Sequence, residues 1–362
     1  MPGRMSADGE LAAWVDLSLV PGLGSQGFRA LLSAFGLPPN VLGATRAQLG
    51  RVVPDSLATL ILEHGRGPGV ENALRWAGQP GHAIVTLADA GYPKQLLEIP
   101  DPPALLYIIG NASLLCAPAL AVVGSRNATP QGLENARNFA RALSDAGFPI
   151  VSGLALGIDS AAHRGGLEGR SSTVAVLGTG ADIVYPRRNE PLAAEIAARG
   201  AIISEFALGT PPVAGNFPRR NRLISGLARG CLVVEAALAS GSLITAKLAA
   251  EQGREVLAIP GSIHSPLSRG CHALIKQGAK LVESAQDVLD ELGGIGASSA
   301  PTSTGATTEH ALLTHMGFDP CDIDALVARS GLTPEAVSAM LLQLELEGKV
   351  ASLPGGLYQR NS

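Results

Sequence analysis

The chain has 362 residues, which exceeds the size of one small module and predicts two or three domains. Hydrophobic residues make up 46% of it and charged residues 16%, so it can bury a core and is not disordered as a whole. The net charge of −4 excludes a protein covered with positive potential. Its four cysteines stand far apart, and we recognise no secretory or membrane-spanning segment. We therefore expect a cytoplasmic protein that uses no membrane, disulfide framework or metal site.

Residues 1–80 have a Leu-spaced pattern that predicts a small helical domain. Within it, Gly22, Gly24 and Gly27 satisfy the G-x-G-x-x-G spacing of dinucleotide-binding loops. A helix-like run over residues 11–20 precedes them where that motif needs a strand, so we reject a dinucleotide site. We interpret VPGLG and the following FRALLSAFG as a helix-hairpin-helix turn. Such a turn serves either packing alone or weak contact with nucleic acid through helix N-terminal amides.

Residues 81–296 alternate short apolar runs with amphipathic stretches. The runs are LAVVG, PIVSG, TVAVLG, AIISEF, CLVVEA and EVLAIPG, and we expect each to be a buried parallel strand. This rhythm predicts an α/β fold with a doubly wound, Rossmann-like parallel sheet. Ligands of such sheets bind outside the carboxyl ends of the strands, so we look for function in the loops there.

Small and polar residues follow the first two of these strands. Gly124, Ser125 and Arg126 come before a helix that we expect to begin after Thr129 and Pro130, and they form either an anion pocket or a tight turn with Arg126 in a structural ion pair. Ser152, Gly153 and Gly157 lie in SGLALGID, where small residues let a backbone or phosphate oxygens approach closely.

Asp159 and His163 fall one helical turn apart and share a face. They form either a catalytic pair or a helix cap beside a hydrogen-bonded histidine, and we favour the second interpretation.

A run of arginines over residues 216–230 contains no acidic residue. We interpret it as an exposed loop whose aromatic ring stacks on unpaired bases while guanidinium groups follow their backbone. The alternative is a solvated charged face. The residues that we assign to this loop are Phe217, Arg219, Arg220, Asn221 and Arg222.

A helix after the strand CLVVEA begins with hydroxyl residues beside a glycine. Its positive dipole end suits a phosphate, although helix capping alone also explains one of the serines. The residues that we assign to this second site are Ser240, Gly241, Ser242, Thr245 and Lys247.

The last part of the chain differs in composition. Residues 297–308 are rich in Ser, Thr, Gly and Pro and predict a linker, and residues 309–362 predict a separate domain. Three basic and seven acidic side chains lie within 307–362, so this part repels phosphate. We expect it to contact protein or to modulate dimerisation.

Motifs of several enzyme classes are missing from the sequence. It contains no G-x-x-x-x-G-K-[ST], no G-x-S-x-G and no H-E-x-x-H. We therefore expect no Walker-type ATPase, no α/β-hydrolase elbow and no zinc protease.

Seven ordered segments together resemble the DprA/Smf DNA-processing family. They are VVGSRNATPQG, IVSGLALGIDSAAH, VAVLGTGADIVYPRRN, ISEFALGTPP, FPRRNRLISGLARG, VVEAALASGSLITAKLAAEQGREVLAIPGS and RGCHALIKQGA, and they span about residues 84–292. The flanks are similar to the sterile-alpha-motif or helix-hairpin-helix domain and the C-terminal winged-helix domain of longer members.

The resemblance implies a homodimeric mediator, without catalysis or cofactor, that binds single-stranded DNA. It further implies that the protein protects incoming DNA and loads the RecA recombinase onto it during natural transformation. By motif matching, Arg126 and the FPRRNR segment would contact DNA, and SGLALGID would shape the pocket.

Two other functions stay open. Nucleoside-monophosphate phosphoribohydrolases share this fold but need P-G-G-x-G-T-x-x-E, and the segment from Ser240 to Lys247 lacks the closing glutamate that would do acid–base work. A protein scaffold that does not bind DNA is the other alternative.

Overall fold

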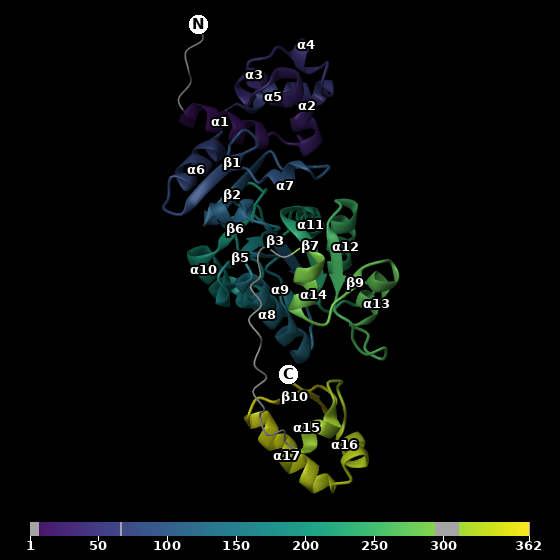
Figure 1. Cartoon of the computed structure of the whole chain (residues 1–362). Coiled ribbons are helices and arrows are strands. Elements are labelled where there is room, and N and C mark those ends of the chain that lie inside the picture. The colour runs from purple at the N-terminus through teal and green to yellow at the C-terminus, as the bar shows by residue number, and fades with distance from the viewer. Residues whose placement is uncertain (1–6, 66, 294–310, 362) are drawn as a thin grey trace.

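The structure is a computed structural model that describes residues 7–65, 67–293 and 311–361. An elongated arrangement places a helical N-terminal region, a central sheet with helices on both faces, and a small C-terminal domain one after another (Figure 1). The predicted linker 297–308 lies outside the described residues. The domain boundaries that we expect near residues 80 and 296 stay predictions.

The N-terminal region is helical, as the sequence predicts. Its helices are α1 (Ala7–Ser18), α2 (Ser25–Phe35), α3 (Pro38–Leu42), α4 (Arg46–Leu49), α5 (Asp55–His64) and α6 (Pro68–Ala77). The turn between α1 and α2 contains Gly22 at φ +81°, a backbone conformation that favours glycine. The core of these helices includes Trp14 and Trp76 and continues to Tyr107 in β2, the second strand of the sheet, and to Ala181 in a loop of the central region. The helical region is therefore packed firmly against one end of the sheet.

The central sheet has nine strands in the order β1-β2-β6-β5-β4-β3-β7-β8-β9. Seven of them are parallel, whereas β1 and β2 form an antiparallel edge that joins β6. The strands are β1 (His82–Thr86), β2 (Leu105–Gly110), β3 (Ala119–Val123), β4 (Ile150–Ser152), β5 (Thr173–Val176), β6 (Ala201–Ser204), β7 (Ala228–Val233), β8 (Glu255–Ala258) and β9 (Lys280–Leu281). The six predicted strands are β3 to β8, and the doubly wound sheet is confirmed. The run LAVVG forms β3, which is the third strand of the sheet in chain order, whereas we expected it to be the first.

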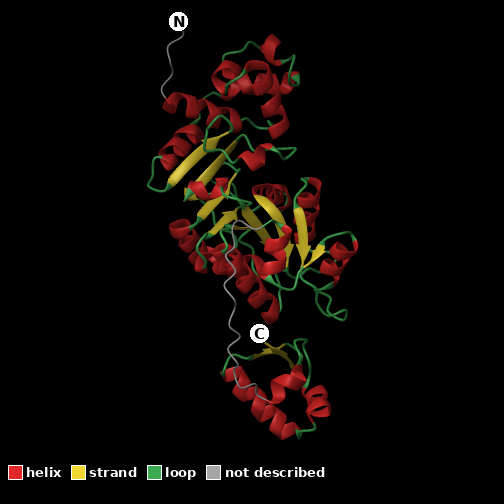
Figure 2. Ribbon diagram, in the orientation of Figure 1, coloured by secondary structure: helices red, strands yellow, loops and turns green. Residues whose placement is uncertain are grey.

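Helices cover both faces of the sheet (Figure 2). One face packs against α7 (Lys94–Leu97), α11 (Asn216–Leu227), α12 (Ser242–Glu251) and α13 (Arg269–Lys276). The other packs against α8 (Pro130–Asp145), α9 (Ile158–Glu168), α10 (Glu190–Arg199) and α14 (Ala285–Glu291). Two 3₁₀ segments, Ala112–Cys116 and Arg187–Asn189, complete the region. In β3 the side chains alternate between these two cores, which explains its uninterrupted apolar sequence.

The C-terminal domain consists of three helices and a two-stranded hairpin. Its elements are α15 (Ala311–Met316), α16 (Ile323–Ser330), α17 (Pro334–Leu346), β10 (Val350–Leu353) and β11 (Leu357–Arg360). Leu326, Val337, Leu341 and Leu344 form its own apolar core. This element order is that of a winged helix, in agreement with the sequence-based prediction.

Candidate nucleic-acid interface

The chain order of the strands reverses between β3 and β7, which is where doubly wound sheets bind ligands. At this point the Ser125 amide donates to the Glu235 carbonyl oxygen at 2.7 Å, and the Ser125 carbonyl oxygen accepts from the Ile158 amide at 3.1 Å. Gly157, at φ +77°, lies so close that an added Cβ would be 2.2 Å from the Ser125 oxygen. The loops after β3, β4 and β7 are therefore locked together at the carboxyl edge.

The N-terminus of α8 faces this edge, and the chain's own carboxylate occupies it. Thr129 caps the helix and donates both its backbone amide, at 2.9 Å, and its hydroxyl, at 2.6 Å, to the Glu235 carboxylate. Burial raises the pKa of Glu235 above its usual range. The predicted anion pocket beside Gly124 and Ser125 thus already contains an internal anion, and an added phosphate would meet its charge.

Arg126 lies at the rim of this region. Its side chain is exposed and, within the described residues, makes no ion pair, so the alternative of a structural ion pair for Arg126 is wrong for this part of the chain. Burial lowers the pKa of Arg220 to about 10, and the charge of Arg126 acts in the same direction.

Buried polar contacts hold the loop 152–157 from below. Arg220 donates to the carbonyl oxygens of Gly153, at 2.7 Å, and Val176. The Asp159 carboxylate accepts from the amides of Gly153, at 3.1 Å, and Ala155, at 3.4 Å. Because Gly153 has no Cβ, the Arg220 guanidinium can approach it; an added Cβ would be 2.3 Å from Nη2.

His163 supports the same loop from α9. Its Nε2 accepts from the Leu154 amide at 3.2 Å, and its Nδ1 lies 2.7 Å from the Thr173 hydroxyl. Burial, followed by the Arg220 charge, lowers the pKa of His163 to about 3. Leu154 itself has φ +56°, a strained conformation for a leucine that this network maintains. The hydrogen-bonded histidine is confirmed, and no hydrogen bond joins Asp159 to His163 within the described residues. The predicted helix cap is wrong, because the N-cap of α9 is Gly157 and the Asp159 carboxylate accepts from amides of the preceding loop.

The arginine run forms the helix α11, and our description of it as an exposed loop without acidic neighbours is wrong. Arg222 is 8% exposed and pairs with the Glu205 carboxylate and, at 3.5 Å, with Asp101. Arg219 is half-exposed and pairs with the same Glu205 at 3.1 Å. Burial is the main cause that raises the pKa of Glu205.

Two arginines of this run point into the protein. Arg220 and Arg222 are both buried, and the Asn221 side-chain oxygen accepts from Arg220 Nε at 3.1 Å. DNA contact by Arg220, Asn221 and Arg222 stays a prediction, and the geometry gives each of them an internal partner.

Phe217 lies near the start of α11, over the loop after β5. An added Cβ on Gly178 would be 2.8 Å from its ring, and the ring centroid is 5.5 Å from that of Tyr185. Tyr185 is exposed and Phe217 is half-buried. The two rings form an aromatic patch at the carboxyl end of β5. The neighbouring strand is β4, and the loop that follows it contacts the backbone of Arg126 through Gly157.

The other predicted hydroxyl residues are held by internal contacts or buried. Ser152 donates to the Val122 carbonyl oxygen at 2.7 Å and is buried. Ser240 and Ser242 hydroxyls lie 2.7 Å apart, and Thr245 is buried. Lys247 is exposed and pairs with Glu251 at 3.7 Å. Capping and packing account for these residues, and their contact with DNA, like that of Gly241 between them, stays a prediction.

Two family models match the central and the C-terminal regions of the chain, in the order in which the structure shows them. The family model described as DNA recombination-mediator protein A matches residues 83–293, and the DprA winged helix domain matches residues 296–356. The chain is 43% identical to the protein Smf of Escherichia coli over 298 residues, which cover 79% of this chain and 80% of that one. This chain belongs to the DprA family.

Two solved DprA structures resemble the chain in fold. DNA processing protein A of Streptococcus pneumoniae has a TM-score of 0.68 and 37% identity, covering 80% of this chain and 99% of that one. DNA processing protein A from Helicobacter pylori, described for its single-stranded DNA binding mode, has a TM-score of 0.53 and 32% identity. It covers 58% of this chain and 95% of that one.

Sequence reasoning did not assign four residues of this candidate site, which are Tyr185, Arg187, Arg188 and Glu205. The two arginines are exposed just before α10 and make no ion pair within the described ranges. They adjoin the loop 152–157, because the side-chain amide of the neighbouring Asn189 donates to the Leu154 carbonyl oxygen at 2.8 Å. The sequence YPRRN after a predicted strand was the available signal for the tyrosine and the arginines. Nothing in the local sequence indicated that Glu205 would neutralise the arginine run.

Within the described ranges, no helix is both long and apolar enough to span a bilayer.

Proposed function

We propose that this chain is a recombination mediator that binds single-stranded DNA along the carboxyl edge of its sheet. The observation that carries the proposal is the aromatic patch of Phe217 and Tyr185 with exposed arginines beside it. These arginines make no ion pair within the described residues, and they are Arg126, Arg187 and Arg188. Rings stack on unpaired bases, whereas the bases of a duplex are already stacked. The single-strand binding described for the Helicobacter pylori relative supports the same function.

The proposed site divides into contacting and positioning residues. Phe217 and Tyr185 would stack on bases. The arginines that would hold phosphates are Arg126, Arg187, Arg188 and Arg219. Gly124, Ser125, Gly153 and Gly157 let the loops approach each other and fix the direction of Arg126. Arg220 and Arg222 act from inside, through the carbonyl oxygen of Gly153 and the Glu205 carboxylate.

We infer a role without catalysis on this fold. A phosphoribohydrolase needs a glutamate that closes its P-G-G-x-G-T-x-x-E segment, and the corresponding segment here, Ser240 to Lys247, has none. Glu235 does not replace it, because both of its carboxylate oxygens are taken by Thr129 at the start of α8. A mediator with no Walker motif acts by mass action.

A homodimer would suit this role, because two sites on one strand raise the effective concentration of the second site. We therefore propose that the dimer protects incoming single strands and loads a RecA-type recombinase onto them during natural transformation. Recombinase filament growth on strands coated by a competing single-strand-binding protein should then accelerate with the dimer. Equal acceleration by an obligate monomer, or ATP turnover by the chain alone, would contradict this mechanism.

The winged-helix domain supports a protein-contact role. Its last helix, α17, corresponds to the helix that enters the major groove in helix-turn-helix proteins, and its sequence PEAVSAMLLQLEL contains no basic residue. Leu342 and Leu346, one turn apart, are 60% and 82% exposed. An apolar, acidic helix face fits another protein and repels phosphate.

The proposal is tested by fluorescence anisotropy with labelled single- and double-stranded oligonucleotides across salt. If Arg126, Arg187, Arg188 and Arg219 neutralise four phosphates, the log–log slope is about −3, a loss of about 50-fold between 50 and 200 mM salt. Arg126→Ala should weaken binding about tenfold and lower the slope by about 0.7.

Arg141→Ala, on an exposed arginine in the last turns of α8, is the matched control and should leave binding unchanged. A slope near zero, or equal affinity for single and double strands, would contradict the proposed function.

A further inference from the structure

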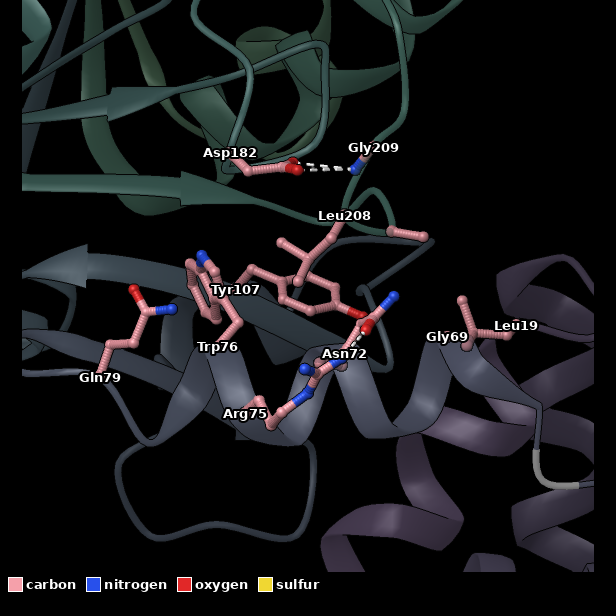
Figure 3. Close-up of a pocket in the computed structure, with 12 residues that line it drawn as sticks. Leu19, Gly69, Asn72, Arg75, Trp76, Gln79, Tyr107, Asp182, Leu208 and Gly209 are labelled. Carbon is pink, nitrogen blue, oxygen red and sulfur yellow. Dashed lines mark hydrogen bonds between the residues drawn. The ribbon is translucent and has the colours of Figure 1, made fainter.

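A second hollow lies beside the proposed site, where the helical region meets the sheet. It has a volume of about 520 Å³ and lies between α6, β2 and the loops that follow β5 and β6 (Figure 3). Trp76, Tyr107 and Leu208 form its apolar wall, and Asn72, Gln79 and Asp182 add polar groups. We call it the junction pocket. Its volume falls within the range of small-molecule pockets, about 300–1,000 Å³.

Two buried side chains of this pocket carry polar groups that lack partners. Tyr107 is 1% exposed and Trp76 is 8% exposed. Within the part of the chain that the structure describes, neither the Tyr107 hydroxyl nor the Trp76 indole N–H makes a hydrogen bond. Neither polar atom is fully buried, and both residues line the pocket, so these two donors are available to whatever enters it.

The protonation of Tyr107 is fixed by its surroundings. Burial, followed by the charge of Asp182, raises the pKa of Tyr107 to about 12. The hydroxyl therefore keeps its proton at neutral pH and can donate it.

The remaining polar groups of the junction pocket supply both hydrogen-bond acceptors and hydrogen-bond donors. Asp182 accepts from the Gly209 amide at 2.9 and 3.0 Å, which fixes its carboxylate and leaves lone pairs on both oxygens. The Asn72 side-chain oxygen is used by Arg75, and the Asn72 amide group stays free to donate among the described residues. Trp76 meets Tyr107 edge to face, with ring centroids 5.6 Å apart. An aromatic wall beside donors and one carboxylate fits a nucleobase.

The loop after β5 connects the junction pocket with the aromatic patch. Gly178, on which the Phe217 ring lies, begins the loop that contains both Asp182 and Tyr185. Tyr107 pairs with Ser204, the last residue of β6, which neighbours β5 in the sheet. Adjacent strands lie about 4.8 Å apart, so the pocket is one or two strand spacings beyond the patch.

We propose that the junction pocket takes one base of the single strand held at the aromatic patch, and that it favours a base with an exocyclic amino group. Asp182 can accept a hydrogen bond from such a group, as carboxylates do from N4 of cytosine, whereas thymine presents the O4 acceptor to it. This inference rests on the proposed function.

The test compares oligonucleotides of twelve cytidines and twelve thymidines by anisotropy with the full chain. We expect at least about fivefold tighter binding of the cytidine strand, the lower end of discrimination by a good base contact. Asp182→Asn keeps an oxygen for Gly209 but loses the charge, and Tyr107→Phe removes only the hydroxyl. Asp182→Asn should reduce the preference and Tyr107→Phe should weaken the binding of both strands, whereas Glu195→Gln, an exposed charge change on α10, should do neither.

Tryptophan fluorescence gives a second readout, because the chain has two tryptophans, Trp14 and Trp76. In a Trp14→Phe chain, the remaining signal comes from the junction pocket and should be quenched more by the cytidine strand than by the thymidine strand. Trp14 stacks on Phe28, so phenylalanine preserves an aromatic contact there. The preference of the unmodified chain for the cytidine strand is measured without any variant, so it does not depend on how well the Trp14→Phe chain folds.

The outcomes separate the two proposals. Strand binding that depends on Arg126 but shows neither a base preference nor quenching of Trp76 overturns the junction pocket and leaves the proposed function intact. No strand binding at all overturns both. A further outcome is that free deoxycytidine monophosphate quenches Trp76 as strongly as the cytidine strand does, and that this quenching stays unchanged when a thymidine strand is bound. That result would show that the junction pocket is a separate nucleotide site, and it would overturn the proposal that the pocket takes a base of the bound strand.

Discussion

The sharpest prediction concerns His163, whose neutral ring holds the loop 152–157. Thr173 donates its own proton to the Ile150 carbonyl oxygen at 2.6 Å, so its hydroxyl oxygen must accept from His163 Nδ1. His163 Nε2 in turn accepts from the Leu154 amide. Both ring nitrogens are therefore committed in the neutral form, and a proton on Nε2 would face another donor.

The magnitude follows from the difference between the two states. The pKa of His163 is about 3 in the folded protein, because of burial and then the Arg220 charge, and about 6.5 in the unfolded chain. As the pH falls below about 6.5, the unfolded chain takes up the proton first, so stability that is present above this pH is lost progressively down to about pH 3. From pH 7.5 to 5, about 1.5 units at about 1.36 kcal/mol each gives a loss of about 2 kcal/mol.

The assay is urea unfolding followed by circular dichroism between pH 5 and 7.5. His163→Gln offers an acceptor and a donor that do not titrate, so its free energy of unfolding should fall by about 2 kcal/mol less than that of the unmodified chain across this range. His264→Gln, at an exposed position, is the control. Buried acids with raised pKa values give the unfolding free energy the opposite dependence on pH, but they do so equally in the unmodified chain and in His163→Gln. These acids are Asp159, Glu205 and Glu235.

Equal pH slopes for the unmodified chain and His163→Gln would refute this reasoning. A direct check is the imidazole resonance of His163, which should not titrate between pH 8 and 5. A titration midpoint near 6.5 would show that the ring is not held as a neutral acceptor.

Three further predictions follow from contacts at the site and from the charge of the C-terminal part. Arg222→Ala should destabilise the chain by about 3–5 kcal/mol in urea unfolding, because it leaves the buried Glu205 carboxylate short of a partner, and unchanged stability would contradict the buried pair. Gly157→Ala should lower single-strand affinity more than tenfold, since its Cβ would be 2.2 Å from the Ser125 oxygen at a φ of +77°. Gly67→Ala, where the Cβ meets nothing within 4 Å, should bind normally. Removing residues 307–362 should leave anisotropy-measured affinity within about threefold, because this acidic part repels phosphate; a larger loss would assign it a DNA contact.

The sequence by itself determined the features that depend on neighbouring residues. Short apolar runs predicted β3 to β8, and Thr129 followed by Pro130 predicted the start of α8. Periodicity and capping act over a few residues, so they can be recognised in a sequence without any tertiary contact. The same local information predicted a ligand site at the carboxyl ends of the strands, since parallel strands bring those ends to one edge.

Only the tertiary structure decided which charges stay free. Arg222 is neutralised by Glu205 and Asp101, which lie outside the acid-free run, and Arg220 is buried against Gly153, 67 residues away along the chain. Likewise, β2 joins the sheet through pairing with β6, about a hundred residues later. Whether an arginine is exposed to a ligand or buried in an ion pair depends on partners that folding brings together from distant segments, and local composition does not contain that information.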